Sequence, residues 1–415
     1  MNILFLHQNY PGQYREIVPA LAAMGGHRIV FLTQRTGLPQ ATDHMIGVYK
    51  SAHKPAKDAW KYSAWFEESI GNAIGVGNAC KLLKQNGFEP DIVTGHANWG
   101  ELLYVKDIWP NAPLLGYFEY YFIAKGGLIG FDPEFREAGD IGPRLFANNA
   151  INHLVFERCD FGITATEWQK STHPSSMRDK LAVIHEGIRT DRLIPDHDSD
   201  FVVEFSAAKF ARGEEIVTYI ARNLEPARGF HTLMRSLPRL QALRPRARVA
   251  IIGGDEISYG FKLAGGQTFR GWLTRELGNS VDWSRVDFLG QIPYDKLIAL
   301  LKLARCHVYL TAPFVPSWSM LEAMALEKTI VSSDVGPVRE IITDGETGLL
   351  VDFFQPTQLA ERIAEVLADK SNLRMIGTAA RKRIVSNYDF TTSTFPKLRM
   401  LMNEWLPQEL RFLTG

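Results

Sequence analysis

The sequence predicts an α/β protein with two doubly wound domains, each built on a parallel sheet. Apolar, strand-like runs alternate with amphipathic helical stretches along most of the chain, and strands joined by crossover helices produce this pattern. The alternation begins at the N-terminus, stops at a polar stretch near residues 196–200, and restarts at Ile216. A chain of 415 residues, of which 46% are hydrophobic, is long enough to bury two separate cores.

We therefore place the two domains at residues 1–200 and 201–387. A last amphipathic segment, residues 388–415, is rich in Leu, Met and Trp. It has too little polar surface to be stable alone in water, so we expect a helix that packs back on the first domain.

The first domain opens as a strand–helix–strand unit. Asn2 to His7 is a buried strand by composition, Pro11-Gly12 is a turn, and Tyr14 to Met24 is an amphipathic helix before a second strand at 28–33. A glycine after the first strand lets a ligand approach the backbone closely, but the full G-x-G-x-x-G pattern is absent. Gly12 alone is therefore weak evidence for a ligand site.

Two titratable side chains follow successive strands of this domain. His96 comes after the short strand 91–94, and Glu119 comes after the strand 113–117. A helix is expected between them, from about Trp99 to Trp109, and two further strands are expected at 160–164 and 181–184. Either residue alone is commonly a hydrogen-bonded loop residue or half of an ion pair. Parallel sheets bind ligands beyond the carboxyl ends of their strands, so the two together predict a pocket. The loop-like stretch Gly126 to Gly142 is expected to cover it.

The most polar cluster of the chain is Asp196-His197-Asp198-Ser199-Asp200. An Asp-x-Asp pair can hold a divalent metal. Here the pair follows Pro195 in a linker and does not follow a buried strand, so a solvated linker is the favoured interpretation. No metal site is predicted.

Two arginines flank the first loop of the second domain. Arg222 closes the strand that starts at Ile216, and Arg228 lies just before the helix that starts at Gly229. Guanidinium groups bind phosphate oxygens in a bidentate fork, and the start of the helix adds backbone amides. Two ordinary surface arginines are an equally weighted alternative.

The stretch from His307 to Asp352 reads as strand, Pro-punctuated loop, short helix and second strand. Its Ser319-x-x-Glu322 spacing matches a capping box, in which the hydroxyl and the carboxylate bind free amides at a helix start. The alternative is that these amides face an anion and Glu322 accepts the hydroxyls of a ribose. On these residues alone, the cap is the favoured interpretation.

Bulk properties exclude several classes of protein. Lys plus Arg equals Asp plus Glu at 46 each, so there is no net basic field for nucleic acid. Three distant cysteines argue against a zinc site or a disulfide framework. The N-terminus begins as a strand without a basic leader, and no run of about 18 apolar residues occurs. We expect a cytoplasmic protein.

Several segments resemble retaining glycosyltransferases of family 4, which have the GT-B fold. Residues 221–240, ARNLEPARGFHTLMRSLPRL, look like the family's basic phosphate-binding segment, and residues 286–310 look like the wall of its nucleobase site. Residues 321–351, LEAMALEKTIVSSDVGPVREIITDGETGLLV, match its hallmark helix and strand, and HQNYPGQY at 7–14 resembles a bacterial subgroup. The resemblance implies two Rossmann-like domains that face a central cleft, with the last helix crossing back.

The resemblance also implies site residues. The catalytic set would be His96, Glu119, Arg222 and Arg228. The donor would be bound by Gly12, Arg222, Arg228, Gly254, Ile292, Ser317, Trp318, Ser319 and Glu322.

Two positions depart from the family pattern. Phe314 stands where the family places a first hallmark glutamate, eight residues before Glu322, and Glu119 replaces a histidine. The acid that orders the donor sugar in the family is therefore missing, and the phosphate and ribose residues remain.

The resemblance implies transfer of a sugar from a nucleotide-diphosphate sugar to an acceptor hydroxyl, with the diphosphate taking the proton and no cofactor or metal. The acceptor stays open between a carbohydrate, a lipid-linked glycan and a small molecule, and so does peripheral contact with the inner face of a membrane. The oligomeric state is not predicted. Two alternatives are a nucleotide-sugar 2-epimerase of the same fold, which Glu119 favours, and a binding protein without catalysis, which Phe314 favours.

Overall fold

The computed structural model describes residues 1–60, 62–135, 141–206, 208–368 and 371–412. By its internal contacts the chain divides into two compact units. Unit 1 comprises Met1–Ala124, Ala138–Gly187 and Phe390–Gly415, and unit 2 comprises Lys125–Glu137 and Ile188–Asp389. The sequence placed these boundaries at residues 200 and 388, whereas the contacts change at Gly187–Ile188 and Asp389–Phe390.

Unit 1 is built on a parallel sheet with the strand order β3-β2-β1-β4-β5-β6-β7. Register pairs such as Ile3 with Ile29 and Ile3 with Ile92 place β1 in the middle of the sheet. The strands are β1 (Asn2–Leu6), β2 (Arg28–Thr33), β3 (Met45–Val48), β4 (Ile92–His96), β5 (Leu114–Tyr117), β6 (Phe161–Thr164) and β7 (Leu181–Val183). The sequence predicted all of these strands except β3, which is half exposed at the sheet edge.

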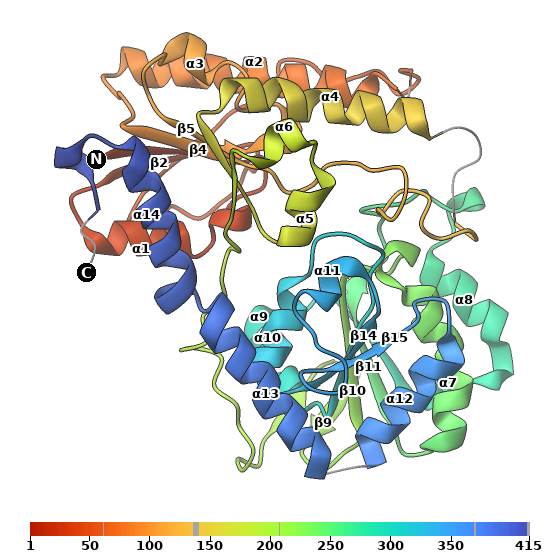
Figure 1. The fold of residues 1–415 in the computed structure, drawn as a ribbon. Helices are drawn as coiled ribbons and strands as arrows, with labels where there is room; N and C mark the ends of the chain where they lie inside the picture. Colours follow the sequence, from red (N-terminus) through yellow and green to blue (C-terminus); the bar gives the residue numbers. More distant parts are fainter. Residues whose placement is uncertain (61, 136–140, 207, 369–370, 413–415) are drawn as a thin grey trace. The chain divides into compact units, whose positions relative to one another are not determined.

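Helices cover both faces of this sheet. Leu4 and Leu6 of β1 point into one core, which α2, α3 and α4 cover, and Ile3 and Phe5 point into the other, which α1 and α14 cover (Figure 1). The helices of unit 1 are α1 (Ile17–Met24), α2 (Ala64–Gln85), α3 (Val105–Ile108), α4 (Gly142–Arg158), α5 (Glu167–Thr172), α6 (Ser175–Arg178) and α14 (Phe395–Trp405). The expected helix from Trp99 to Trp109 is mostly turns, because only α3 and the 3₁₀ turn Ala97–Trp99 are helical there.

Unit 2 holds a second parallel sheet with the order β12-β11-β10-β13-β14-β15. Its strands are β10 (Ile216–Asn223), β11 (Arg248–Gly254), β12 (Val286–Gly290), β13 (Cys306–Tyr309), β14 (Thr329–Ser333) and β15 (Leu349–Val351). The hairpin of β8 (Val202–Glu204) and β9 (Lys209–Ala211) was not predicted. The helices are α7 (Phe230–Leu243), α8 (Phe269–Leu277), α9 (Tyr294–Leu303), α10 (Trp318–Ala325), α11 (Gly336–Arg339), α12 (Pro356–Ala368) and α13 (Ser371–Tyr388).

Residues 126–135 of the predicted covering loop belong to unit 2, whereas Gly142 begins α4 of unit 1. The ring of Phe131 lies 5.1 Å from that of Phe353, and Asp132 pairs with His231 at 3.1 Å. Glu134 accepts two hydrogen bonds from Arg235, at 2.6 and 2.7 Å. Residues 136–140 of the predicted loop lie outside the described residues. Within the described ranges, no helix is both long enough and apolar enough to cross a membrane.

Candidate functional site

His96 and Glu119 meet at the carboxyl edge of the unit 1 sheet. His96 is the last residue of β4 and is fully buried, and Glu119 lies two residues beyond the end of β5. The Nε2 atom of His96 lies 3.4 Å from Oε2 of Glu119. The sequence placed these two residues in one pocket, and within unit 1 the structure brings them together.

A hydrogen bond to His96 determines which ring nitrogen carries the proton in the neutral imidazole. Its Nδ1 accepts from the backbone N–H of Asn98 at 3.2 Å, so in the neutral imidazole the proton sits on Nε2 and faces Glu119. The indole of Trp99 stacks on the imidazole at 4.0 Å with an interplanar angle of 11°. The ring therefore has a fixed position and a defined donor.

Glu119 also belongs to a line of polar contacts, named the relay below, that the sequence did not predict. Gln13 donates from Nε2 to Oε1 of Glu119 at 2.9 Å, and its Oε1 lies 2.5 Å from Nε2 of buried His7. Nδ1 of His7 accepts from the N–H of Asn9 at 2.9 Å, so Nε2 of His7 is the donor to Gln13. His7, Gln13, Glu119 and His96 thus form a line of polar contacts. The motif HQNYPGQY contains the first two, but its spacing does not reveal the contact of Gln13 with Glu119, which lies far away in the sequence.

Gly12 is required by the packing of this relay. Its φ is +51°, and a Cβ atom there would lie 2.5 Å from the His7 ring. Any side chain would displace the imidazole that orients Gln13. Gly12 therefore supports the Gln13 contact through the backbone.

A buried acid lies in the same unit. Glu101 is fully buried and accepts a hydrogen bond from the hydroxyl of Tyr49. Burial raises the pKa of Glu101 to about 8, against the lowering effects of the Tyr49 hydroxyl and of the Gln8 backbone. Glu101 was not singled out from the sequence, because it lies in a turn, where hydrophobic periodicity does not mark buried positions.

Arg228 is the most constrained cation at the carboxyl edge of the unit 2 sheet. It ends the 3₁₀ turn Pro226–Arg228 that leads into α7. Its NH1 donates to Thr311 Oγ1 at 3.0 Å, to the Tyr309 hydroxyl at 3.3 Å and to the carbonyl of Val315 at 3.4 Å. The guanidinium carbon lies 5.0 Å from the Tyr259 ring centroid. The side chain is thus held in one orientation while still half-buried.

Glu225 keeps Tyr259 in place beside Arg228. This fully buried carboxylate accepts from the backbone N–H groups of Ser258 at 3.1 Å and Tyr259 at 2.9 Å. Burial raises the pKa of Glu225, and these two hydrogen bonds act in the opposite direction. Asn223 adds a bond to the Ser258 hydroxyl at 2.8 Å. Neither Glu225 nor Asn223 was singled out from the sequence.

Phe314 lies against the same arginine. Its ring centroid is 5.4 Å from the Arg228 guanidinium carbon and 4.8 Å from the Tyr259 ring centroid. The position where the family pattern has an acid is therefore filled by an aromatic that covers the cation.

The other predicted donor residues of unit 2 have different environments. Arg222 is exposed near the end of β10. Its side chain makes no hydrogen bond or ion pair with the described residues. Gly254 ends β11, and a Cβ atom there would lie 2.7 Å from Asn223 Oδ1. Ile292 follows β12 and packs, half-buried, on an apolar cluster. These residues lie at the carboxyl ends of strands, as predicted.

The predicted capping box is wrong. The residue before α10 that caps it is Ser317, whose side chain accepts from Ser319 N at 3.3 Å. Ser319 is therefore inside the helix, Trp318 begins it, and Glu322 lies too far along to bind the first amides. Buried Glu322 instead accepts from the hydroxyl of Tyr294 at 2.9 Å.

The acidic linker folds as a turn. Asp196 Oδ1 accepts from Ser199 N at 2.9 Å, and Arg212 donates to the carbonyls of the same stretch. Within the described part of the chain, no group of three or more His, Cys, Asp or Glu side chains is arranged to hold a metal ion.

Comparison with known proteins finds two family models that match this chain. Residues 25–193 match the family model described as "Glycosyl transferase family 4 group", and residues 203–383 match "Glycosyl transferases group 1". The chain belongs to glycosyltransferase family 4. It is therefore an enzyme of glycosyl transfer, and neither model describes an epimerase.

Relatives and solved structures agree with this assignment. This glycosyltransferase is 28% identical to a glycogen synthase of Mycobacterium tuberculosis over 94% of this chain and 92% of that one. A D-inositol 3-phosphate glycosyltransferase of Nocardia farcinica is 31% identical over 49% of this chain and 43% of that one. HepE of Anabaena in complex with UDP-glucose superposes with a TM-score of 0.70 at 15% identity, over 97% of this chain and 99% of that one. The fold is GT-B.

Proposed function

We propose that the glycosyltransferase takes a hexose from a nucleoside diphosphate sugar and passes it, with retention of anomeric configuration, to a hydroxyl of a carbohydrate acceptor. One observation carries the donor class: Arg228 is held by Tyr309 and Thr311 at the carboxyl edge of a parallel sheet, where such sheets bind nucleotides. The UDP-glucose complex of HepE and the glycogen synthase relative support this donor and acceptor.

Arg228 would stabilise the leaving diphosphate. Its guanidinium presents further N–H groups beyond the NH1 that binds Thr311, and a fixed fork matches two phosphate oxygens. Exposed Arg222 would add a second, mobile charge. Because the positive charge comes from side chains, we propose that transfer proceeds without a metal or another cofactor.

Glu322 would bind the ribose. Its Oε1 is already fixed by the Tyr294 hydroxyl, so the carboxylate has a defined orientation for accepting hydroxyl protons. The N-terminal residues of α10, Ser317 to Ser319, would lie along the diphosphate.

His96 and Glu119 would hold a sugar hydroxyl. Nε2–H of His96 can donate to the oxygen of a hydroxyl group, and the Glu119 carboxylate can accept the proton of the same group. In the proposed step, the bond from the anomeric carbon to the diphosphate oxygen breaks as the acceptor oxygen bonds to the same face. The acceptor proton passes to a diphosphate oxygen.

The test is a panel of UDP-, GDP- and ADP-hexoses with mono- and oligosaccharide acceptors. We expect one donor to release its nucleoside diphosphate only when acceptor is present, and NMR of the product to show the donor's anomeric configuration. An inverted product would contradict the retaining mechanism. Binding of a donor without any acceptor-dependent release would instead favour a non-catalytic binding protein.

A further inference from the structure

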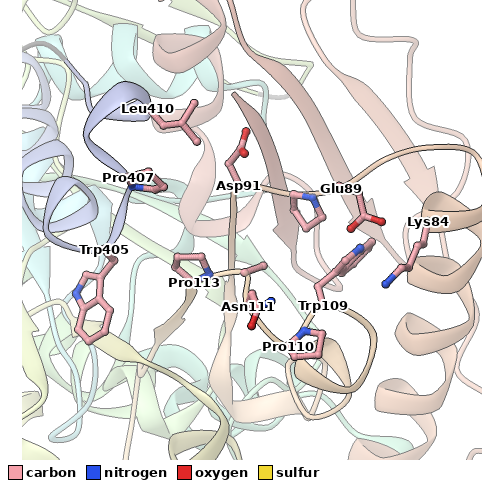
Figure 2. A pocket seen from close by; sticks show the side chains of 12 residues that line it. Lys84, Glu89, Asp91, Trp109, Pro110, Asn111, Pro113, Trp405, Pro407 and Leu410 are labelled. Carbon is pink, nitrogen blue, oxygen red and sulfur yellow. The ribbon is translucent and has the colours of Figure 1, made fainter.

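An open pocket of about 390 Å³ lies within unit 1, a size typical of small-ligand sites. We call it the amino-edge pocket. Three segments far apart in the sequence line it: residues 84–91, residues 109–113 and residues 405–410. Figure 2 shows Trp405, Pro407 and Leu410 on one side, and Lys84, Glu89 and Trp109 on the other.

The pocket is separate from the His96–Glu119 pair. Asp91 of the pocket immediately precedes β4, and His96 ends that strand. A strand of five residues at about 3.3 Å each spans roughly 17 Å. Pro113 likewise precedes β5, and Glu119 follows it. The two sites therefore occupy opposite edges of one sheet.

Trp405 offers an open aromatic face. Its indole stacks on Phe161 at 4.9 Å with an interplanar angle of 1°. Phe161 covers one face of the indole, and the residue is still 42% exposed. A flat apolar surface open on one side is suited to the C–H face of a sugar ring, because both surfaces lose contact with water when they meet.

Trp109 forms part of the pocket wall. The residue lines the pocket and is 3% exposed. Its rigid, buried side chain gives that wall a fixed shape.

The charged groups of the pocket have mixed sign. Lys84 donates to the carbonyl of Ile108 at 2.7 Å and has further protons, and Asp91 accepts from Asn2 N at 2.7 Å through one oxygen. Exposed Glu89 adds a second carboxylate. Two carboxylates disfavour a phosphate and the ammonium disfavours a cation, whereas neutral hydroxyls can donate to the acids and accept from Lys84.

We propose that the amino-edge pocket binds a neutral oligosaccharide at a second site, remote from the transfer site. Trp405 provides the platform, Lys84 a donor, and Glu89 and Asp91 the acceptors for hydroxyl groups. Such a site would hold a glycan chain on the enzyme independently of its reacting end.

The experiment is native gel electrophoresis of the full chain through gels that contain soluble glycogen, dextran or α-mannan, without any donor. We expect at least one polymer to retard the wild type. Trp405→Ala should raise the dissociation constant at least 10-fold, and Glu89→Gln, which removes an exposed carboxylate that lines the pocket, several-fold. The matched control is Trp60→Ala, which removes an exposed tryptophan that does not line the pocket.

Failure to retard the wild type in all three gels would overturn the proposal, and so would equal retardation of wild type and Trp405→Ala. Thermal melts check that both pocket variants fold; if Trp405→Ala does not, Glu89→Gln decides alone. Because no donor is present, the result is independent of the proposed transfer reaction. In a separate assay, Trp405→Ala should keep wild-type transfer to a monosaccharide acceptor and lose it to a long one.

Discussion

The guanidinium carbon of Arg228 lies 5.4 Å from the centre of the Phe314 ring, with Tyr259 completing the aromatic contact. Cation–π contacts of this kind hold a guanidinium without cancelling its charge. A carboxylate at position 314 would act differently, because it would pair with the cation. Phe314 thus leaves the positive charge of Arg228 without a neutralising carboxylate at this position, so the charge can act on a diphosphate.

Replacing Phe314 with an acid tests this role. At an effective dielectric constant of about 20, opposite charges about 5 Å apart attract by about 3 kcal/mol. Phe314→Glu should therefore weaken nucleoside diphosphate binding at least 10-fold relative to Phe314→Leu, which removes the ring without adding charge. Calorimetric titration of both variants with the preferred nucleoside diphosphate gives the ratio. Tighter binding by the glutamate variant would show that an acid is useful here and that the charge argument is wrong.

Glu119→Gln tests the relay in unit 1. The variant keeps the shape and removes the charge, and it can place an NH₂ group opposite the Nε2–H of His96. Hydrogen bonds to a charged group contribute about 1.5–3 kcal/mol, so kcat/KM should fall about 10- to 100-fold while the melting temperature changes little. Exposed Glu157→Gln in α4 is the control and should keep wild-type kinetics. Equal losses of stability and activity in Glu119→Gln would assign Glu119 a structural role only.

Gln13→Ala separates the two arms of that relay. Gln13 connects His7 to Glu119, so its loss should lower kcat/KM but less than Glu119→Gln does, because the His96 contact remains. Steady-state kinetics of both single variants and of the double variant give the coupling. A double variant whose losses simply add would show that the two residues act independently.

The buried acid Glu101 predicts a pH dependence of stability. Its folded pKa is about 8 and its ordinary value is 4.5, so the folded state binds the proton more tightly. Its contribution is fully present below about pH 4.5 and is lost as the pH rises through 8. Buried His173 and His307 have lowered pKa values of about 4 and about 3, so most of their stability change lies below their ordinary value of 6.5. Burial lowers the pKa of Lys328 to about 8, so this residue adds stability as the pH rises through 8. The difference between the wild type and a variant without the Glu101 carboxyl therefore reports on Glu101 from pH 6.5 to 8.

Urea unfolding followed by circular dichroism measures this effect. The unfolding midpoint of the wild type should fall between pH 6.5 and 8 relative to that of Glu101→Gln, which still accepts from Tyr49. A difference between the two midpoints that stays constant over this interval would contradict a raised pKa for Glu101.

A chelator tests the proposed independence from metals. Because Arg228 and Arg222 are proposed to neutralise the diphosphate, transfer should keep most of its wild-type rate in excess EDTA. Loss of activity in EDTA that Mg²⁺ or Mn²⁺ restores would reject this part of the proposal.

Most of the fold could be predicted because it rests on local patterns. Buried apolar runs fixed the strands of both sheets, and alternating side chains such as Ile3 and Leu4 enter opposite cores. The strand β3 and the hairpin β8–β9 were missed because short, half-exposed strands carry weak periodicity. The helix expected at Trp99–Trp109 was too long because tertiary contacts, such as the Trp99–His96 stack, override helical propensity there.

The site was predictable in its residue types and less so in its contacts. Strand ends placed His96, Glu119 and Arg228 correctly at the carboxyl edges. The capping box failed because Ser317 competes with Ser319 as the cap, and the two are two residues apart with identical side chains. Glu225 and Gln13 act through partners distant in sequence, at Tyr259 and Glu119. No spacing rule within one segment reveals such contacts.

The most direct test of the account is the affinity of Arg228→Lys for a nucleoside diphosphate and for the matching nucleoside. Titrations use UDP and uridine, GDP and guanosine, and ADP and adenosine, with Arg285→Lys, an exposed arginine of the same unit, as the control. We predict that Arg228→Lys weakens the preferred diphosphate at least 10-fold and leaves its nucleoside unchanged, because lysine lacks the bidentate fork. Equal diphosphate affinity in Arg228→Lys and the wild type would contradict the assignment of Arg228 to the donor phosphates.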